Sequence, residues 1–202
     1  MTRTWWHRTA EVAELLVWSA CGQEPTLGRG RLICVDGPAG SGKTSLARAL
    51  VVAAAELGSA RLLHMDDMYE GWSGLGDVSA RIDRDLLRPL AACTPGRYRR
   101  YDWHEKQFAE WHTVDPLDVL VLEGVGSGAS VYDDLITTLV WVEAPRETRI
   151  SRGIDRDGEQ VREHWMAWMA DEDRLYARER TKARADVLVD GTGTSEQPVV
   201  FC

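Results

Sequence analysis

Short apolar runs alternate along most of the chain with longer segments of helical periodicity. Between the runs, apolar residues such as Leu46, Leu50 and Leu57 recur at helical spacing. Runs with the length and composition of buried strands occupy residues 31–35, 61–64, 117–122, 138–143 and 186–189. Strands that alternate with helices pair in parallel, so the pattern predicts an α/β fold with a five-stranded parallel sheet flanked by helices.

The segment before the first strand predicts an added helix. Val12, Leu15 and Leu16 follow helical spacing within residues 9–20, and a connection containing Gly and Pro leads from there to residue 30. A chain of 202 residues with 44% hydrophobic composition is long enough for one sizeable core. We therefore expect a single domain over residues 1–202, with residues 1–30 as the N-terminal helix and its connection.

The segment after the first strand carries the strongest chemical signal. It matches the phosphate-loop pattern G-x-x-x-x-G-K-[ST] and is followed by Ser45. Its residues are Gly37, Pro38, Ala39, Gly40, Ser41, Gly42, Lys43 and Thr44. Glycines let the backbone wrap a polyphosphate, Lys43 can reach its β and γ phosphates, and the Thr44 hydroxyl can bind Mg²⁺. The sequence therefore predicts a P-loop nucleotide site for ATP, with GTP as the alternative, together with magnesium.

Acidic residues follow two other predicted strands. Asp66 and Asp67 come after the second strand, and Glu123 ends the strand at 117–122. Ligands of open α/β sheets bind at the carboxyl ends of the strands, so these acids can face the loop. One of the aspartates can take a proton from an attacking hydroxyl or help to hold magnesium, and Glu123 is a candidate magnesium partner.

Arginines recur at helical spacing in residues 145–160. Arg146, Arg149, Arg152 and Arg156 fall three or four positions apart, on one side of a predicted helix. A solvated face is the alternative, because acidic residues are interspersed. We expect a short lid whose Arg149, Arg152 and Arg156 bind the polyphosphate and support phosphoryl transfer.

Composition limits the partners and the compartment. The formal charge of −8 argues against a nucleic-acid surface. No apolar stretch approaches the length that spans a bilayer, so no membrane partner is expected. The four cysteines are far apart and include no C-x-x-C pair, which favours reduced thiols in a cytoplasm. The oligomeric state, including a homo-oligomer, stays open.

In order and spacing, these elements resemble the uridine kinase-like family of P-loop kinases, which includes the uridine–cytidine kinase, phosphoribulokinase and pantothenate kinase groups. Asp66-Asp67-Met68-Tyr69 is similar to the Asp-Ser-Phe-Tyr element whose first Asp is the general base. Tyr101-Asp102-Trp103 resembles the element that lines the nucleoside pocket, and Leu122-Glu123-Gly124-Val125 resembles a Glu-Gly-Ile element. Residues 148–152 resemble the start of the lid, and residues 184–189 resemble the strand near the C-terminus.

The resemblance implies a kinase that transfers the γ-phosphoryl group of ATP to a hydroxyl, foremost that of a nucleoside. Asp66, Lys43 and Arg152 are then the catalytic residues, while Thr44, Asp66 and Glu123 surround the metal. Candidates for acceptor binding are Asp66, Tyr69, Asp83, Tyr101 and His104. His104 lies earlier than the family's base-contacting His, and the lid is several residues shorter.

Other readings of the sequence stay open. The acceptor can be a sugar, a vitamin precursor or an antibiotic hydroxyl, because pockets vary on one catalytic frame. A nucleoside monophosphate kinase would need an extra phosphate site, which Arg97, Arg99 and Arg100 could supply. From a different class, a regulatory nucleotide-binding protein without catalysis is a further alternative; a GTP switch would need [NT]-K-x-D, and Thr181-Lys182-Ala183-Arg184 lacks the Asp.

Overall fold

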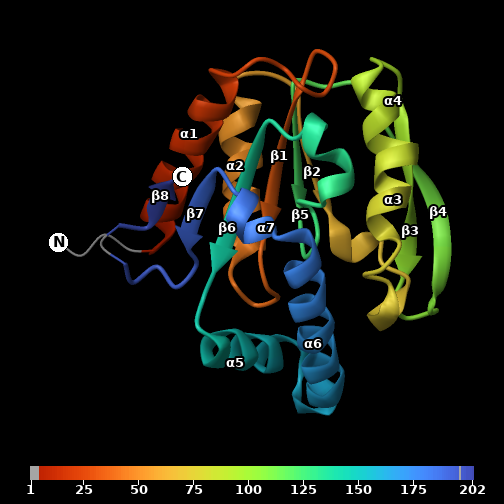
Figure 1. The fold of residues 1–202 in the computed structure, drawn as a ribbon, viewed down its shortest axis with the longest axis vertical. Helices are drawn as coiled ribbons and strands as arrows, with labels where there is room; N and C mark the ends of the chain where they lie inside the picture. Colours follow the sequence, from red (N-terminus) through yellow and green to blue (C-terminus); the bar gives the residue numbers. More distant parts are fainter. Residues whose placement is uncertain (1–4, 196) are drawn as a thin grey trace.

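The computed structural model describes residues 5–195 and 197–202, so residues 1–4 of the predicted N-terminal segment lie outside it. At its centre is a six-stranded sheet of order β2-β5-β1-β6-β7-β8 (Figure 1). The strands are β1 (Arg31–Asp36), β2 (Ala60–His64), β5 (Val119–Glu123), β6 (Thr138–Glu143), β7 (Val187–Asp190) and β8 (Val199–Phe201).

The predicted α/β fold with a parallel sheet is confirmed. The first five strands in this order pair in parallel and correspond to the five predicted runs. The prediction missed β8, which pairs antiparallel with β7 at the edge. With three residues, of which Val200 and Phe201 are exposed, β8 is too short to show a periodic signal.

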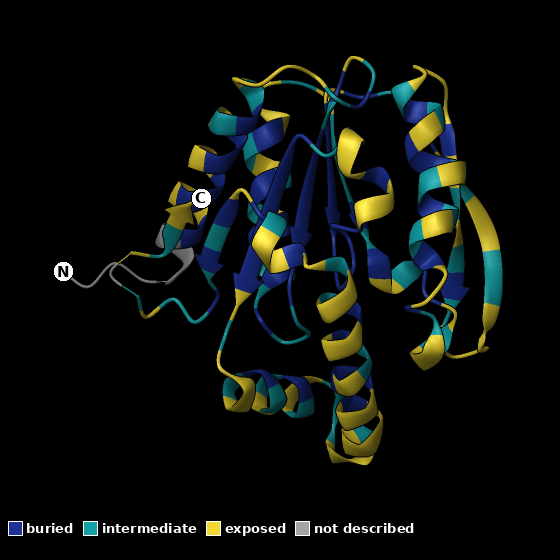
Figure 2. Cartoon of the chain, in the orientation of Figure 1, coloured by how far each residue is buried: buried dark blue, intermediate teal, exposed yellow. Residues whose placement is uncertain are grey.

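Alternate residues of the buried strands belong to two different cores. Leu32 and Cys34 of β1 belong to one apolar cluster, and Ile33 and Val35 belong to the other. Successive side chains of a strand point to opposite faces, so helices cover the sheet on both sides. In Figure 2 the strands at the centre are accordingly buried along most of their length.

The second cluster lies under two helices. Helix α1 (Trp5–Cys21) and helix α2 (Lys43–Ala55) pack against each other and contribute Leu16 and Leu50, which are fully buried. The predicted helix at residues 9–20 is thus present and begins four residues earlier.

The first cluster is covered by short helices and by one long helix. These elements are α3 (Val78–Ile82), η3 (Asp83–Leu87), α4 (Arg88–Ala91), η4 (Ser130–Leu135), α6 (Arg162–Glu179) and α7 (Thr181–Arg184). The turns η1 (Met65–Asp67) and η2 (Gly71–Ser73) follow β2. Leu86 and Leu87 of η3, Tyr132 of η4 and Trp168 of α6 are among the buried residues of this cluster.

A separate two-stranded hairpin flanks α3 and α4 (Figure 1). Strand β3 (Gly96–Asp102) pairs antiparallel with β4 (Gln107–Val114). The hydrophobic pattern did not predict it, because Gly96, Tyr101 and Val114 are its only buried residues and most of its other positions are polar.

The predicted lid is a helix at the carboxyl edge of the sheet. Helix α5 (Arg146–Asp157) follows β6 and leads through η5 (Glu159–Val161) into α6 (Figure 1). In the described part of the chain, no helix combines the length and the apolar character that crossing a bilayer requires.

Replacement of Leu50 by Ala tests the packing of α2 on the sheet. Leu50 is fully buried, so we expect Leu50→Ala to lower the free energy of unfolding by about 3 kcal/mol through lost burial and a residual cavity. Val52 lies on the same helix with 67% of its surface exposed, and Val52→Ala should change the stability by less than about 0.5 kcal/mol. Urea denaturation followed by circular dichroism measures both; equal effects would contradict this packing.

Candidate active site

The phosphate loop connects β1 to α2 through backbone that favours glycine. Gly40 has a φ of 77° and Gly42, which precedes the first residue of α2, has a φ of 107°. A Cβ on Gly40 would also lie 2.6 Å from the carbonyl oxygen of Arg149 in α5. Lys43 Nζ donates to the Pro38 carbonyl at 2.9 Å, which closes the loop on itself.

Asp36, the last residue of β1, connects the start of the phosphate loop to the segment that follows β5. Its fully buried carboxylate accepts the amides of Gly37, Gly126 and Gly128 at 2.7 to 2.9 Å and the hydroxyl of Tyr176 at 2.8 Å. Burial raises the pKa of Asp36, and these hydrogen bonds oppose that rise. Sequence reasoning gave Asp36 no role, although an acid at the end of a buried strand was the available signal.

Glu123 lies beside the start of α2. The parallel register sets it opposite Val35 of β1 and His64 of β2. Its Oε1 accepts the Thr44 hydroxyl at 3.1 Å and lies 2.5 Å from His64 Nδ1. The hydrogen bond with Glu123 raises the pKa of His64. Two of the three residues predicted at the metal, Thr44 and Glu123, are therefore in direct contact. His64 is a neighbour that the sequence did not indicate.

Asp66 lies in η1, directly after β2, on the same cleft. Desolvation by the surrounding protein raises the pKa of its carboxyl, although part of the residue is open to the cleft. The negative charge of Glu123 raises this pKa further, while Lys43 and Arg156 lower it. The Asp66 carbonyl accepts the indole N–H of Trp103 at 2.8 Å, which fixes the turn. Asp67 lines the cleft as well.

One cavity of about 700 Å³ brings these groups together. From the predicted set, it is lined by Ala39, Gly40, Gly42, Lys43, Thr44, Ser45, Asp66, Tyr69, Glu123, Arg152 and Arg156. Gly37, Pro38 and Ser41 belong to the loop but do not line this cavity. The strand order β2-β5-β1 explains the arrangement, since Asp66, Glu123 and the loop lie at the carboxyl ends of three adjacent parallel strands.

The residues present fit a magnesium nucleotide. The Thr44 hydroxyl and the Glu123 carboxylate are oxygen ligands of the kind that Mg²⁺ prefers, and they meet at the N-terminus of α2. Lys43, Arg152 and Arg156 place positive charge around a loop that leads into the N-terminus of a helix. Both features favour the binding of an anion such as a polyphosphate. Within the described residues, no group of three or more His, Cys, Asp or Glu forms a metal site of its own.

The predicted lid arginines take different positions. Arg152 lines the cavity and donates to the carbonyls of Gly40 and Gly191 at 3.2 and 3.1 Å. Arg156 also lines it and forms a paired contact with Asp157 at 2.7 and 2.9 Å. Arg149 does not line the cavity: its buried guanidinium lies 3.5 Å from Glu172 of α6. Arg146 is half exposed and lies 3.9 Å from Asp173.

Aromatic rings form one wall of the cavity. Trp72, Trp103, Trp165 and Trp168 line the cavity together with Tyr69. Trp72 meets Trp103 and Trp168 edge to face, with ring centroids 5.6 and 5.8 Å apart. The resemblance placed Trp103 in an element that lines the acceptor pocket, whereas the sequence assigned Trp72, Trp165 and Trp168 no position at the site. The count of nine tryptophans was the available signal.

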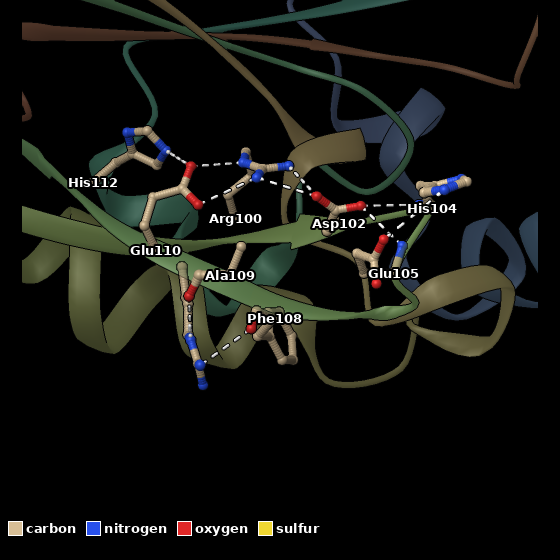
Figure 3. Close-up of polar contacts among 9 residues, drawn as sticks. Arg100, Asp102, His104, Glu105, Phe108, Ala109, Glu110 and His112 are labelled. Atoms are coloured by element: carbon tan, nitrogen blue, oxygen red, sulfur yellow. Dashed lines mark hydrogen bonds and ion pairs between the residues drawn. The ribbon is translucent and has the colours of Figure 1, made fainter.

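Three residues predicted at the acceptor do not line this cavity. The Asp83 carboxylate pairs with Arg88 at 2.8 Å, and Tyr101 is buried against Phe108 and Trp103. Figure 3 shows His104 next to Glu105 at the turn of the β3–β4 hairpin, where 94% of its side chain is exposed. Tyr69 does line the cavity, and its hydroxyl donates to the Val125 carbonyl at 2.5 Å.

The arginines considered as an extra phosphate site belong to the same hairpin. Arg100 pairs with Glu110 and Asp102 (Figure 3), and Arg99 donates to the carbonyls of Ala109 and Phe108. Arg97 lies over the ring of Trp111. None of the three arginines lines the cavity, which leaves the phosphate loop and Arg152 and Arg156 as its positively charged part.

Comparison with known proteins gives a consistent result. The chain is 28% identical over 188 residues to a uridine kinase from Leuconostoc citreum, covering 80% of this chain and 88% of that protein. Its structure resembles that of a possible uridine kinase from Bacillus stearothermophilus, with a TM-score of 0.63 and 25% identity over 87% of this chain and 96% of the other. No protein-family model matches.

The resemblance to uridine kinase-like P-loop kinases is confirmed. A D-glycerate 3-kinase from Cryptococcus neoformans shares the fold, with a TM-score of 0.61 and 12% identity over 99% of this chain and 100% of the other. The relatives are kinases and support phosphotransferase chemistry for this P-loop protein.

Replacement of Asp36 by Asn tests whether this carboxylate ties together the segments that follow β1 and β5. The Asn amide group would turn toward the Gly128 N–H, which Asp36 Oδ2 accepts at 2.9 Å, so we expect Asp36→Asn to lower the free energy of unfolding by about 2 kcal/mol. Tyr176→Phe removes one donor and should cost about 1 kcal/mol. Urea denaturation measures both, and wild-type stability of Asp36→Asn would contradict this role.

Proposed function

We propose that the protein is an ATP-dependent small-molecule kinase that transfers the γ-phosphoryl group to a hydroxyl, foremost that of a nucleoside. The observation that carries the proposal is the single cavity in which the phosphate loop faces Asp66, Glu123 and an aromatic wall. A nucleotide-binding protein without acceptor chemistry would need the loop alone.

Different residues around the cavity perform different steps of phosphoryl transfer. Asp66 takes the proton of the acceptor hydroxyl as its oxygen forms a bond to the γ-phosphorus. The bond between that phosphorus and the bridging oxygen breaks, and ADP leaves with the electron pair. Lys43, Arg152 and Arg156 stabilise the negative charge that develops on the transferred group.

Thr44 and Glu123 would hold magnesium, which offsets phosphate charge when bound. Glu123 is kept in place by its contact with His64 and by the Thr44 hydroxyl. Helix α5 already lies against the loop at Gly40, so Arg152 needs little movement to support the phosphates.

The aromatic wall supports an acceptor with a planar ring. Trp72 and Trp103 are more than one third exposed and lie close to Asp66, where a base could stack while its sugar hydroxyl meets the carboxylate. The uridine kinase relative is in line with this acceptor. The candidate contacts Asp83 and His104 are not part of the proposal, because they lie away from the cavity.

A sugar or another small hydroxyl compound is the second candidate acceptor. The fold is shared with a glycerate kinase, so the frame by itself does not select the ring. A monophosphate acceptor has less support, because Arg97, Arg99 and Arg100 do not line the cavity.

The direct test is an ATP-consumption assay with magnesium against nucleosides, nucleoside monophosphates, sugars and hydroxylated antibiotics. We expect ADP release that depends on a nucleoside and a product one phosphoryl group heavier by mass spectrometry. Turnover with a sugar and with none of the nucleosides would show that the acceptor is a sugar. Mg·ATP binding without turnover on any compound would support the regulatory alternative.

Replacement of Asp66 tests the base. Asp66→Asn keeps the size of the side chain but cannot take the proton, so we expect kcat to fall by about 10³ while the dissociation constant for Mg·ATP changes less than about threefold. Steady-state kinetics and calorimetry measure the two quantities.

The adjacent acid supplies the control. Asp67 lies next in the chain and lines the same cleft, so Asp67→Asn makes the same change one position away. It should lower kcat far less than Asp66→Asn does. The opposite ranking would make Asp67 the base, and wild-type turnover of both variants would exclude a carboxylate base at this turn.

A further inference from the structure

A buried ion pair joins the lid, the phosphate loop and helix α6. The Arg149 Nη1 lies 3.5 Å from the Oε2 of Glu172, with 9% and 1% of the two side chains exposed. Neither residue lines the nucleotide cavity. A buried ion pair is costly to form, and it does not by itself explain why the lid contains an arginine at this position.

The two members of the pair hold both polar groups of one loop residue. The Ala39 N–H donates to Glu172 Oε1 at 2.8 Å, and the Ala39 carbonyl accepts Arg149 Nη1 at 3.5 Å. Ala39 and the next residue, Gly40, line the cavity. The ion pair thus fixes the peptide groups at the point where the loop begins to face the nucleotide.

The same carboxylate also reaches the aromatic wall. Trp168 Nε1 donates to Glu172 Oε1 at 2.8 Å, and the Trp168 ring meets Tyr69 edge to face with centroids 5.1 Å apart. Burial raises the pKa of Glu172, while Lys43, the Ala39 amide and Arg149 lower it. One side chain therefore connects the loop to the aromatic wall.

We propose that Arg149 and Glu172 are positioning residues, which hold the phosphate loop in the conformation that binds the nucleotide. In this role Arg149 does not contact phosphate, and Glu172 does more than support the fold. This inference rests on the proposed function and deepens it. It replaces the sequence-based expectation that Arg149 binds the nucleotide directly.

Single substitutions distinguish positioning of the phosphate loop from a direct electrostatic effect of the two charges on the nucleotide. If the charges act directly on the phosphates, loss of the Glu172 carboxylate strengthens nucleotide binding and loss of the Arg149 guanidinium weakens it. If the pair positions the loop, both losses weaken binding, because either one frees a peptide group of Ala39. The two explanations thus predict opposite signs for Glu172.

The experiment measures the dissociation constant for Mg·ATP by calorimetry in the absence of an acceptor. We expect Glu172→Met and Arg149→Met each to weaken binding about tenfold, as the loss of a charged hydrogen bond would. Glu172→Gln keeps an oxygen for the Ala39 amide and should retain more affinity than Glu172→Met. Tighter binding by Glu172→Met, or unchanged binding by both single variants, would overturn the proposal.

The double variant Arg149→Met/Glu172→Met covers the case in which an unpaired buried charge prevents folding. Removal of both charges of a buried pair is tolerated better than removal of one. The double variant leaves the net charge near the loop unchanged, so weaker binding supports positioning and wild-type binding overturns it. Urea denaturation confirms that each protein is folded at the temperature of the titration.

A control distinguishes this inference from the function on which it rests. Asp118 precedes β5 at the opposite end of the sheet and accepts hydrogen bonds from Ser59, so Asp118→Asn removes an acid without touching the loop. It should bind Mg·ATP as the wild type does. Absence of binding by the wild type would refute the proposed kinase, whereas normal binding and turnover in all the variants would refute only the positioning role.

Discussion

The site depends on backbone amides that are held in place by buried carboxylates. Asp36 accepts three backbone N–H groups from the two segments that follow β1 and β5, and Glu172 accepts a fourth from Ala39. A loop rich in glycine has many conformations, so an anion site built on its amides needs partners that select one of them. Both carboxylates have raised pKa values because of burial, yet each is surrounded by donors that favour the charged form.

Around this loop, the parallel sheet brings the chemical groups to one edge. β2, β5 and β1 are neighbours, and the residues that follow them are Asp66, Gly124 with the adjacent Glu123, and the phosphate loop. Helices α5 and α6 close the other side, with Arg152 and Arg156 facing the loop and tryptophans forming the wall. This arrangement has a charged half suited to a nucleotide and an aromatic half suited to an acceptor. The proteins that the chain resembles in sequence and structure are kinases.

The two halves explain why the acceptor is harder to assign than the nucleotide. Phosphate binding uses backbone and a few charged side chains, and their pattern is continuous in the sequence. The aromatic wall, which we propose for the acceptor, combines side chains from η2, the turn after β3 and α6, which are far apart along the chain. Such a wall can change without affecting the loop, so related frames accept different hydroxyl compounds.

The sequence by itself determined the parallel α/β frame, the phosphate loop, the acids Asp66 and Glu123 at the carboxyl ends of strands, and the arginine-bearing helix α5. These features are local or follow from a period of two or 3.6, so the apolar pattern and the motif contain them. The short strand β8 and the polar β3–β4 hairpin lacked such a pattern and were missed. Only the tertiary structure decided that Arg149 pairs with Glu172 while Arg152 and Arg156 face the cavity, since all three arginines share one helix and differ in what packs against it. It also decided that Trp72 lines the cavity and that Asp83 and His104 do not, because these positions depend on contacts between segments distant in the chain.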